Sequence, residues 1–188
     1  MSLYRKHRPS KLTEVLGQPS AVQQLQRFTE NNTTPHFLLF TGSSGCGKTT
    51  LARILARSLK CSRQDFREIN AADFIRNKMN LTPMGGLVRI WLMDEAHQLT
   101  TAAQDSFLKI LEDTPEHVYF FFATTIKDKL IKTIRNRATE IKVADLPDPE
   151  LAKLIDRTVK DEKEKLRASV RDKIVEHSEG SARKALVL

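Results

Sequence analysis

One octapeptide of the sequence has the residue types that hold a phosphate chain: Gly42-Ser43-Ser44-Gly45-Cys46-Gly47-Lys48-Thr49, followed by Thr50. It matches the pattern G-x-x-x-x-G-K-[ST] at every fixed position, between an expected strand and an expected helix. Its glycines let the backbone approach an anion, so that successive N–H groups and the helix N-terminus face the phosphates. We expect Lys48 to reach the β- and γ-phosphates and the Thr49 hydroxyl to bind Mg²⁺. The sequence therefore predicts a site for ATP and magnesium.

Two consecutive carboxylates, Asp94 and Glu95, follow the apolar run Val88–Met93. At the end of a strand beside the phosphate loop, Asp94 is expected to hold Mg²⁺ opposite Thr49, directly or through water. Glu95 is then placed to polarise an attacking water, which predicts ATP hydrolysis. The tetrad Asp94-Glu95-Ala96-His97 also resembles the box of certain helicases, but those proteins need two RecA-like domains and this chain has room for one.

Three further places offer groups that would complete such a site, and each has a plainer alternative. A hydroxyl of Thr124 or Thr125 could orient the lytic water, or the pair simply caps a strand. Arg135 or Arg137 could stabilise a neighbouring subunit's γ-phosphate, or both belong to a solvated basic face. Arg183 could reach bound nucleotide from the C-terminal helices, or it lies on the surface.

The elements that position these residues follow from the hydrophobic pattern. We expect strands at 36–41, 66–70, 88–93, 118–123 and 139–143, and helices at 49–59, 101–111 and 129–137. After Leu146-Pro147-Asp148-Pro149 the pattern is purely helical, at 150–165, 168–178 and from Ser181. The alternation predicts an α/β domain over residues 1–145, with a parallel five-stranded sheet and helices on both faces. A small all-helical lid domain is expected over residues 146–188.

Composition narrows the classes of partner. The formal net charge is +8, and most of the excess lies in residues 1–145, which fits a nucleic-acid partner or a merely basic surface. Cys46 and Cys61 form no C-x-x-C pair, so we expect neither a zinc site nor a disulfide framework, and a reducing, cytosolic setting. The start has no signal-peptide pattern and no apolar run is long enough for a bilayer, so no membrane is expected.

Several segments spread over nearly the whole chain form one ordered set of motifs. They are Tyr4-Arg5-Lys6-His7-Arg8-Pro9, Glu14-Val15-Leu16-Gly17-Gln18, Asp94–Leu99, Leu108–Glu112, Pro115–His117, Phe122–Thr125, Thr133–Arg137 and Gly180–Leu186. This set resembles the AAA+ ATPase subunits of sliding-clamp loaders, both the bacterial DNA polymerase III gamma/tau subunit and the replication factor C small subunit. The resemblance implies an AAA+ P-loop NTPase fold.

The resemblance also implies roles for residues that the pattern alone leaves open. In that family the N-terminal segment wraps the adenine, which implies contacts from Tyr4, Arg5, Pro9 and Val15. Thr125 is similar to the family's sensor-1 residue. Arg137 is similar to the arginine finger that acts on the neighbouring subunit, and Arg183 to the sensor-2 arginine.

The function that the resemblance implies is that of a clamp-loader ATPase. ATP and Mg²⁺ would bind at interfaces between AAA+ subunits in a ring or arc. Hydrolysis would then load a sliding clamp on primer–template DNA, without sequence preference, at the nucleoid in the cytoplasm of a bacterial, archaeal or virus-infected cell. Other members of the superfamily, such as a helicase loader or a recombination or fork-maintenance motor, remain alternatives, as does a weakly hydrolysing ATP-gated adaptor.

The chain also departs from that family's pattern. Asn136 and Ala138 replace the Ser and Cys that usually flank the finger, and the segment between Ala72 and Arg89 is several residues shorter. We expect the zinc module and the collar domain of the family to be absent from this sequence.

Overall fold

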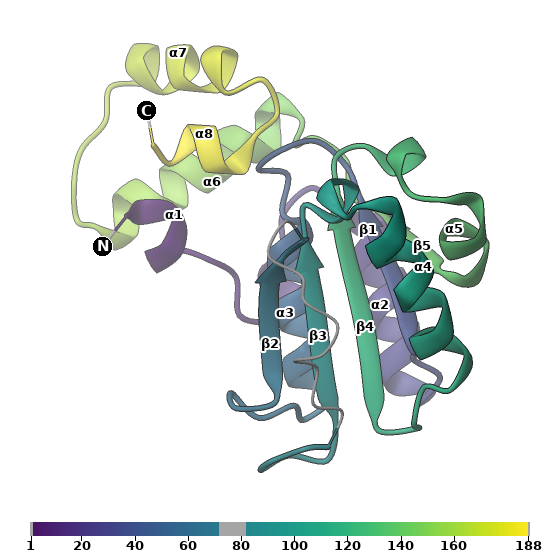
Figure 1. The fold of residues 1–188 in the computed structure, drawn as a ribbon. Helices are drawn as coiled ribbons and strands as arrows, with labels where there is room; N and C mark the ends of the chain where they lie inside the picture. The colour runs from purple at the N-terminus through teal and green to yellow at the C-terminus, as the bar shows by residue number, and fades with distance from the viewer. Residues whose placement is uncertain (1, 72–81, 188) are drawn as a thin grey trace.

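The computed structural model describes residues 2–71 and 82–187 (Figure 1), so part of the short segment after Ala71 lies outside the described residues. The helices are α1 (Leu3–Lys6), α2 (Pro19–Glu30), α3 (Lys48–Ser58), α4 (Thr101–Glu112), α5 (Lys132–Arg137), α6 (Asp148–Asp161), α7 (Ala168–Ser178) and α8 (Ala182–Ala185), with 3₁₀ turns η1 (Leu12–Glu14), η4 (Ala96–Gln98) and η5 (Lys127–Lys129). The strands are β1 (Phe37–Thr41), β2 (Phe66–Asn70), β3 (Arg89–Asp94), β4 (Val118–Thr124) and β5 (Thr139–Lys142).

The five strands form one parallel sheet in the order β2-β3-β4-β1-β5, which confirms the predicted α/β class. β1 therefore lies between β4 and β5, and β4 separates it from β3. All but one residue of β4 are buried, as expected for a strand whose two faces are both covered. Because all strands run the same way, the phosphate loop after β1 and the carboxylates after β3 come to one edge of the sheet.

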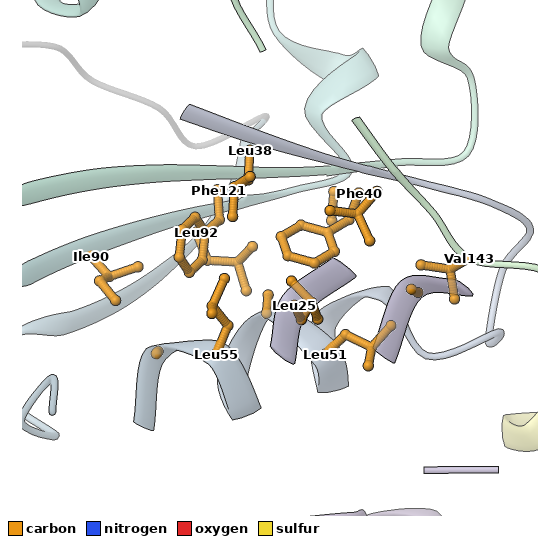
Figure 2. Close-up of a cluster of buried hydrophobic side chains, with 14 of the residues drawn as sticks. Leu25, Leu38, Phe40, Leu51, Leu55, Ile90, Leu92, Phe121 and Val143 are labelled. Atoms are coloured by element: carbon orange, nitrogen blue, oxygen red, sulfur yellow. The ribbon is translucent and has the colours of Figure 1, made fainter. Parts of the chain in front are cut away.

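Alternate residues of each strand point to two separate cores. One core holds Leu38, Phe40 and Phe121 from the sheet against Leu25 of α2 and Leu55 of α3 (Figure 2). The opposite core is aromatic: Phe107 of α4 packs edge-on against Phe120 and Phe122, with ring centroids 6.0 and 5.1 Å apart. Helices thus cover both faces of the sheet. α3 begins directly after the phosphate loop and packs on the same face as α2.

The helix expected at 129–137 is interrupted. Instead, η5 ends at Lys129 and α5 begins at Lys132. The cause is Gln104, buried in α4, whose amide nitrogen donates to the carbonyl oxygens of Leu99 and Lys129 and whose oxygen accepts from the backbone N–H of Ile131 at 2.7 Å. These bonds hold the backbone of residues 129–131 outside a helix.

Two other helices also differ from the expectation. α6 ends at Asp161 rather than 165, because Lys163 adopts φ +59° and the Glu164 N–H turns back to the carbonyl of Val159 at 3.0 Å. α2 was not predicted, although Pro19 at its first turn and its buried Ala21 and Leu25 are ordinary helix signals.

A third core joins the C-terminal helices. Its buried members are Leu146, Leu151, Leu154, Ile155, Val175 and Ala185, and Leu16 from the N-terminal segment packs against it. In Figure 1 α6, α7 and α8 form a group beyond the carboxyl ends of the strands, with α1 beside them. The N-terminal segment is therefore built between the sheet domain and these helices.

At the opposite edge of the sheet, Asp65 organises the turn that leads into β3. Its fully buried carboxylate accepts the backbone N–H groups of Met84, Gly85 and Gly86 and lies 3.3 Å from Arg89. Burial alone would raise the pKa of Asp65, but these hydrogen bonds and that of Ser62 outweigh it and lower the pKa to about 2.

We predict that this carboxylate makes stability depend on pH in the acid range. Since the folded-state pKa lies below the ordinary value of 3.8, the contribution of Asp65 is complete above that value and is lost as pH falls through about 2. Asp65→Asn should cost about 3 kcal/mol of unfolding free energy at neutral pH and remove this part of the acid dependence. Urea unfolding between pH 2 and 7 measures both. Asp128→Asn, at an exposed site, is the matched control, and an equal loss in both variants would contradict the prediction.

Candidate functional site

The phosphate loop follows β1 and has the conformation that only glycine adopts freely. Gly42, Gly45 and Gly47 have φ of +151°, +81° and +116°. A Cβ at Gly42 would lie 2.1 Å from the carbonyl oxygen of Val143, so the loop is also held close to the chain after β5. α3 begins directly after Gly47, and its first N–H groups therefore open into the loop.

Lys48 and Thr49 start α3 at the floor of this loop. The Lys48 ammonium is nearly buried and donates to the carbonyl oxygens of Gly42 at 2.9 Å and Ser43 at 2.6 Å. The Thr49 hydroxyl donates to the Asp94 carboxylate at 3.4 Å. The structure thus brings together the three side chains that the sequence selected for phosphate and Mg²⁺.

The carboxylate Glu95 lies beside His97, which the sequence analysis did not assign to the site, and His97 lies beside Thr124, one of the two threonines that the sequence offered. Its backbone has φ +51°, uncommon for a non-glycine residue, and its N–H donates to Asp94 at 3.1 Å. Its side chain lies 3.4 Å from Nδ1 of His97, which in turn lies 3.3 Å from the buried Thr124 hydroxyl. Glu95, His97 and Thr124 thus form one polar chain beside the loop.

A pocket joins this region to the N-terminal segment. Its lining includes Tyr4, Pro9, Val15, Ser44, Gly45, Cys46, Gly47, Lys48, Thr49, Thr50, Asp94, Glu95 and Arg183, and adds His7, Arg8, Gln18 and Arg157. The buried amide of Gln18 fixes one wall, because it donates to the carbonyl of Ala144 at 2.6 Å and accepts its N–H at 3.0 Å. Burial raises the pKa of the Cys46 thiol, so the loop cysteine is a neutral packing group.

The C-terminal helices close the pocket from the other side. The Arg183 N–H approaches the carbonyl of Gly45 at 3.4 Å, and the Arg183 guanidinium lies 5.8 Å from the ring centroid of Tyr4. Leu146 and Gly180 are joined by a backbone hydrogen bond of 2.9 Å. Residues far apart in sequence therefore meet over the loop.

Five of the predicted site residues do not line this pocket. They are Arg5, Gly42, Ser43, Thr125 and Arg137. Arg5 is exposed and donates to the Tyr4 hydroxyl at 3.2 Å, and the Ser43 hydroxyl donates to Asp145. Thr125 follows β4, and it is the preceding Thr124 whose hydroxyl faces His97.

Arg137 lies at the end of α5, apart from the pocket of its own chain. Its guanidinium donates to the Glu112 carboxylate at 2.8 Å and approaches the carbonyl of Leu108 at 3.4 Å. The side chain is partly exposed, so it is reachable from outside the chain. Arg137 therefore takes no part in the pocket of its own chain, and its action on a neighbouring subunit stays a prediction.

The donor set suits magnesium bound together with a nucleotide. Thr49 and Asp94 supply a hydroxyl and a carboxylate oxygen, the ligand types that Mg²⁺ prefers, and phosphate and water usually supply the rest. Within residues 2–71 and 82–187, no three His, Cys, Asp or Glu side chains gather as a metal-binding group of their own. The residues thus fit Mg²⁺ that arrives with a triphosphate.

The family model described as DNA polymerase III, delta subunit, matches two overlapping stretches, residues 17–73 and 63–147. The chain belongs to this family. Among its relatives, the DNA polymerase III subunit gamma/tau of Mycobacterium tuberculosis is 34% identical over 86% of this chain and 33% of its own length. The replication factor C small subunit of Methanothermobacter thermautotrophicus is 31% identical over 97% of this chain and 60% of its own length. These matches confirm the resemblance to clamp-loader AAA+ subunits, and the chain spans only a third of the gamma/tau relative.

Solved structures share the fold of this chain. The Thermotoga maritima RuvB Holliday junction branch migration motor superposes with a TM-score of 0.80 over 96% of this chain and 63% of that chain, at 23% identity. A mutant of RuvB from the same organism gives a TM-score of 0.81 over 97% of this chain and 64% of that chain, at 22% identity. At this identity the likeness concerns the AAA+ fold alone. In the described part of the chain no helix has the length and apolar character needed to cross a membrane.

We predict that Gly45 is required for the contact between the loop and α8. A Cβ at Gly45 would lie 2.2 Å from the Ser181 hydroxyl, which caps α8, and 3.0 Å from Cβ of Arg183. Gly45→Ala should therefore lower the unfolding free energy by about 2–4 kcal/mol, because backbone strain and the clash add.

Gly47→Ala is the matched control, since Gly47 also has positive φ but a Cβ there would meet nothing within 4 Å. Gly47→Ala should lower the unfolding free energy only by the backbone strain, about 1–2 kcal/mol. Thermal unfolding of both variants without nucleotide gives the comparison. Equal losses would show that α8 does not press on the loop.

Proposed function

We propose that this chain binds ATP with Mg²⁺ in the pocket between the phosphate loop, the N-terminal segment and the C-terminal helices, and hydrolyses it. The observation that carries the proposal is the convergence of Lys48, Thr49 and Asp94 on one glycine loop. Family membership supports the same conclusion, because an ATP-hydrolysing P-loop module is the common part of the AAA+ superfamily.

Each side chain has a distinct task in this proposal. The loop N–H groups and Lys48 bind the phosphate oxygens and neutralise their charge. Thr49 and Asp94 would hold Mg²⁺, which would supply neutralisation of the phosphate charge. Glu95 orients and polarises the attacking water. Thr124, through His97, is better situated than the predicted Thr125 to fix the Glu95 carboxylate.

We further propose that residues 1–145 and 146–188 act as a core and a lid. The separate apolar core of α6 to α8 supports this division, and the contacts of Arg183 with Gly45 and Tyr4 would link the lid to nucleotide. Tyr4, Pro9 and Val15 would contact the base, and Arg5 would act through Tyr4. Arg137 would leave Glu112 to reach the γ-phosphate of an adjacent AAA+ subunit.

The proposed client is a sliding clamp on primer–template DNA, bound in a ring or arc of AAA+ subunits at the nucleoid. The names of the gamma/tau and replication factor C relatives support this choice. The net charge of +8 suits contacts with DNA phosphates, which are strongly salt-dependent and carry no sequence information. In this proposal, contact with DNA would trigger ATP hydrolysis.

We predict that Lys48→Ala abolishes nucleotide binding while the fold persists. The variant loses the ammonium that compensates the triphosphate, so its affinity for ATP should fall by about 100-fold or more. Titration calorimetry with ATP and Mg²⁺ measures the loss, and circular dichroism checks the fold. Lys129→Ala, an exposed lysine outside the pocket, should bind as the wild type does. Unchanged binding by Lys48→Ala would refute the phosphate site.

Glu95→Gln is predicted to separate binding from hydrolysis. The amide keeps the size of the side chain but cannot polarise water, so ATP should bind with near wild-type affinity and turn over at least about 100-fold more slowly. Phosphate release should be followed with primed DNA, a sliding clamp and partner subunits, each also omitted in turn. Normal turnover by Glu95→Gln would remove Glu95 from the mechanism, and stimulation by DNA without any effect of a clamp would favour another DNA-associated motor.

A further inference from the structure

Two carboxylates at the carboxyl end of α6, Asp161 and Glu162, bind the end of α1. The Lys6 ammonium donates to Glu162 at 2.7 Å, and Nε2 of His7 donates to the same carboxylate at 2.5 Å. Nδ1 of His7 lies 3.6 Å from Asp161, and the imidazole is nearly buried. Within residues 2–71 and 82–187, the side-chain hydrogen bonds and ion pairs of Lys6 and His7 all go to these two acids. We call these four side chains the lock.

The position of the two acids on the helix supports a role in this contact. Carboxylates at the carboxyl end of a helix are unfavourable by themselves, because the helix dipole already places negative charge there. The lock supplies the compensating donors. Hydrogen bonds from Lys6 and His7 outweigh the small effect of burial and hold the pKa of Glu162 below its ordinary value of 4.5. The acids are thus matched by the N-terminal segment.

The stretch around η1 contacts both parts of the chain. Arg57 of α3 donates to the carbonyl of Ser10 at 3.1 Å, and Val15 packs against the core between α3 and the sheet. From the other side, Arg157 in the middle of α6 donates to the carbonyl of Glu14 at 3.3 Å. This stretch therefore holds the N-terminal segment to the sheet domain as well as to α6.

α1 differs, because its side-chain contacts go to the helices of the proposed lid. Tyr4 lies against α8, where the Arg183 guanidinium is 5.8 Å from the centroid of the Tyr4 ring. Lys6 is bound to the end of α6 through the lock. Figure 1 shows α1 beside α6 and α8, beyond the carboxyl ends of the strands. The wall of the pocket that includes Tyr4 is thus attached to the lid.

The lock lies at the end of α6 that is farther from the sheet domain. α6 begins at Asp148, directly after the segment that leads out of β5, and ends at Asp161 after 14 residues. At 1.5 Å per residue, this end lies about 20 Å along the helix from that segment. A rotation of the lid about the segment would displace the far end of α6 most, and the lock binds α1 to that end.

We propose that the lock fixes α1 to the lid, so that the lid carries the N-terminal wall of the nucleotide pocket with it. This inference rests on the proposed function, in which Tyr4 contacts the base. Glu162 accepts from both Lys6 and His7 but lies outside the lining of the pocket. It is therefore a positioning residue, which holds Tyr4 at the base without touching the nucleotide.

The first test compares Glu162→Gln with wild type in calorimetric titrations of ATP with Mg²⁺, adenosine, and inorganic tripolyphosphate with Mg²⁺. ATP and adenosine should each bind about 3- to 10-fold more weakly, because the wall at the base is loosened. Tripolyphosphate should bind within about 2-fold of wild type, because the phosphate loop is unchanged. Glu164→Gln is the matched control: Glu164 is an exposed carboxylate two residues further on, outside the lock, and its loss should leave all three affinities unchanged.

A charge reversal provides the rescue. Lys6→Glu alone places a third carboxylate beside Asp161 and Glu162, so it should weaken ATP binding by at least about 10-fold. Combining Lys6→Glu with Glu162→Lys restores an ion pair of opposite sense. The double variant should bind ATP at least about 5-fold more tightly than Lys6→Glu alone, which loss of packing would not produce.

Hydrogen–deuterium exchange without nucleotide tests the lock itself. In Glu162→Gln, the backbone amides of α1 and His7 should exchange about 3- to 10-fold faster than in the wild type, while those of β1 keep their rates. Glu164→Gln should exchange as the wild type does.

The outcomes separate the lock from the ATP site. Unchanged exchange in α1, equal losses for ATP and tripolyphosphate, unchanged ATP affinity in Glu162→Gln, or a failed rescue would each overturn the lock. Wild-type protein that binds neither ATP nor tripolyphosphate would instead overturn the proposed function.

Discussion

In a parallel sheet every strand ends at the same edge, and the candidate site depends on that constraint. β1 delivers the glycine loop and β3 delivers Asp94, while β4 lies between them and delivers Thr124. Because both faces of the sheet are covered by helices, packing fixes these strand ends relative to one another, with the Thr49 hydroxyl 3.4 Å from Asp94. A short cluster of polar groups is thus positioned by apolar packing that lies beneath it.

The loop also forms the contact between the two parts of the chain. Gly45 has no side chain where Ser181 and Arg183 approach, and Ser43 and Gly42 lie against the chain that leads from β5 into α6. If the loop moves when an anion binds, α8 and the segment that leads into α6 must move with it, because both contact the loop directly. Under the proposed division into core and lid, these contacts would transmit a change in the loop to α8, since each involves backbone or short side chains with little freedom to absorb movement.

The positive charges of the pocket favour binding of an anion and lower the stability of the protein without one. Lys48, Arg157, Arg183 and Arg8 line this pocket together with the acidic side chains of Glu14, Asp94 and Glu95, which already contact Ser10, Thr49 and His97. Such clustering stabilises a bound polyphosphate, and it lowers the stability of the protein without one. Asp65 differs, because its buried carboxylate already accepts three backbone N–H groups and an Arg89 N–H, so its role is structural.

The sequence by itself determined the parallel α/β class, the strands and the phosphate loop with its acidic partner, because each depends on local pattern: apolar runs of strand length, glycines at fixed spacing, and carboxylates directly after a strand. It did not determine α2, the break at Gln104 or the end of α6, where tertiary hydrogen bonds or one left-handed residue outweigh periodicity. Nor did it distinguish Thr124 from Thr125, since which hydroxyl faces His97 depends on the strand's orientation in the sheet. Arg8 stands in the motif Tyr4–Pro9, but the motif does not say what its side chain faces. Only the tertiary structure shows that it lines the same pocket as Arg183, because the two residues come from segments distant in the chain.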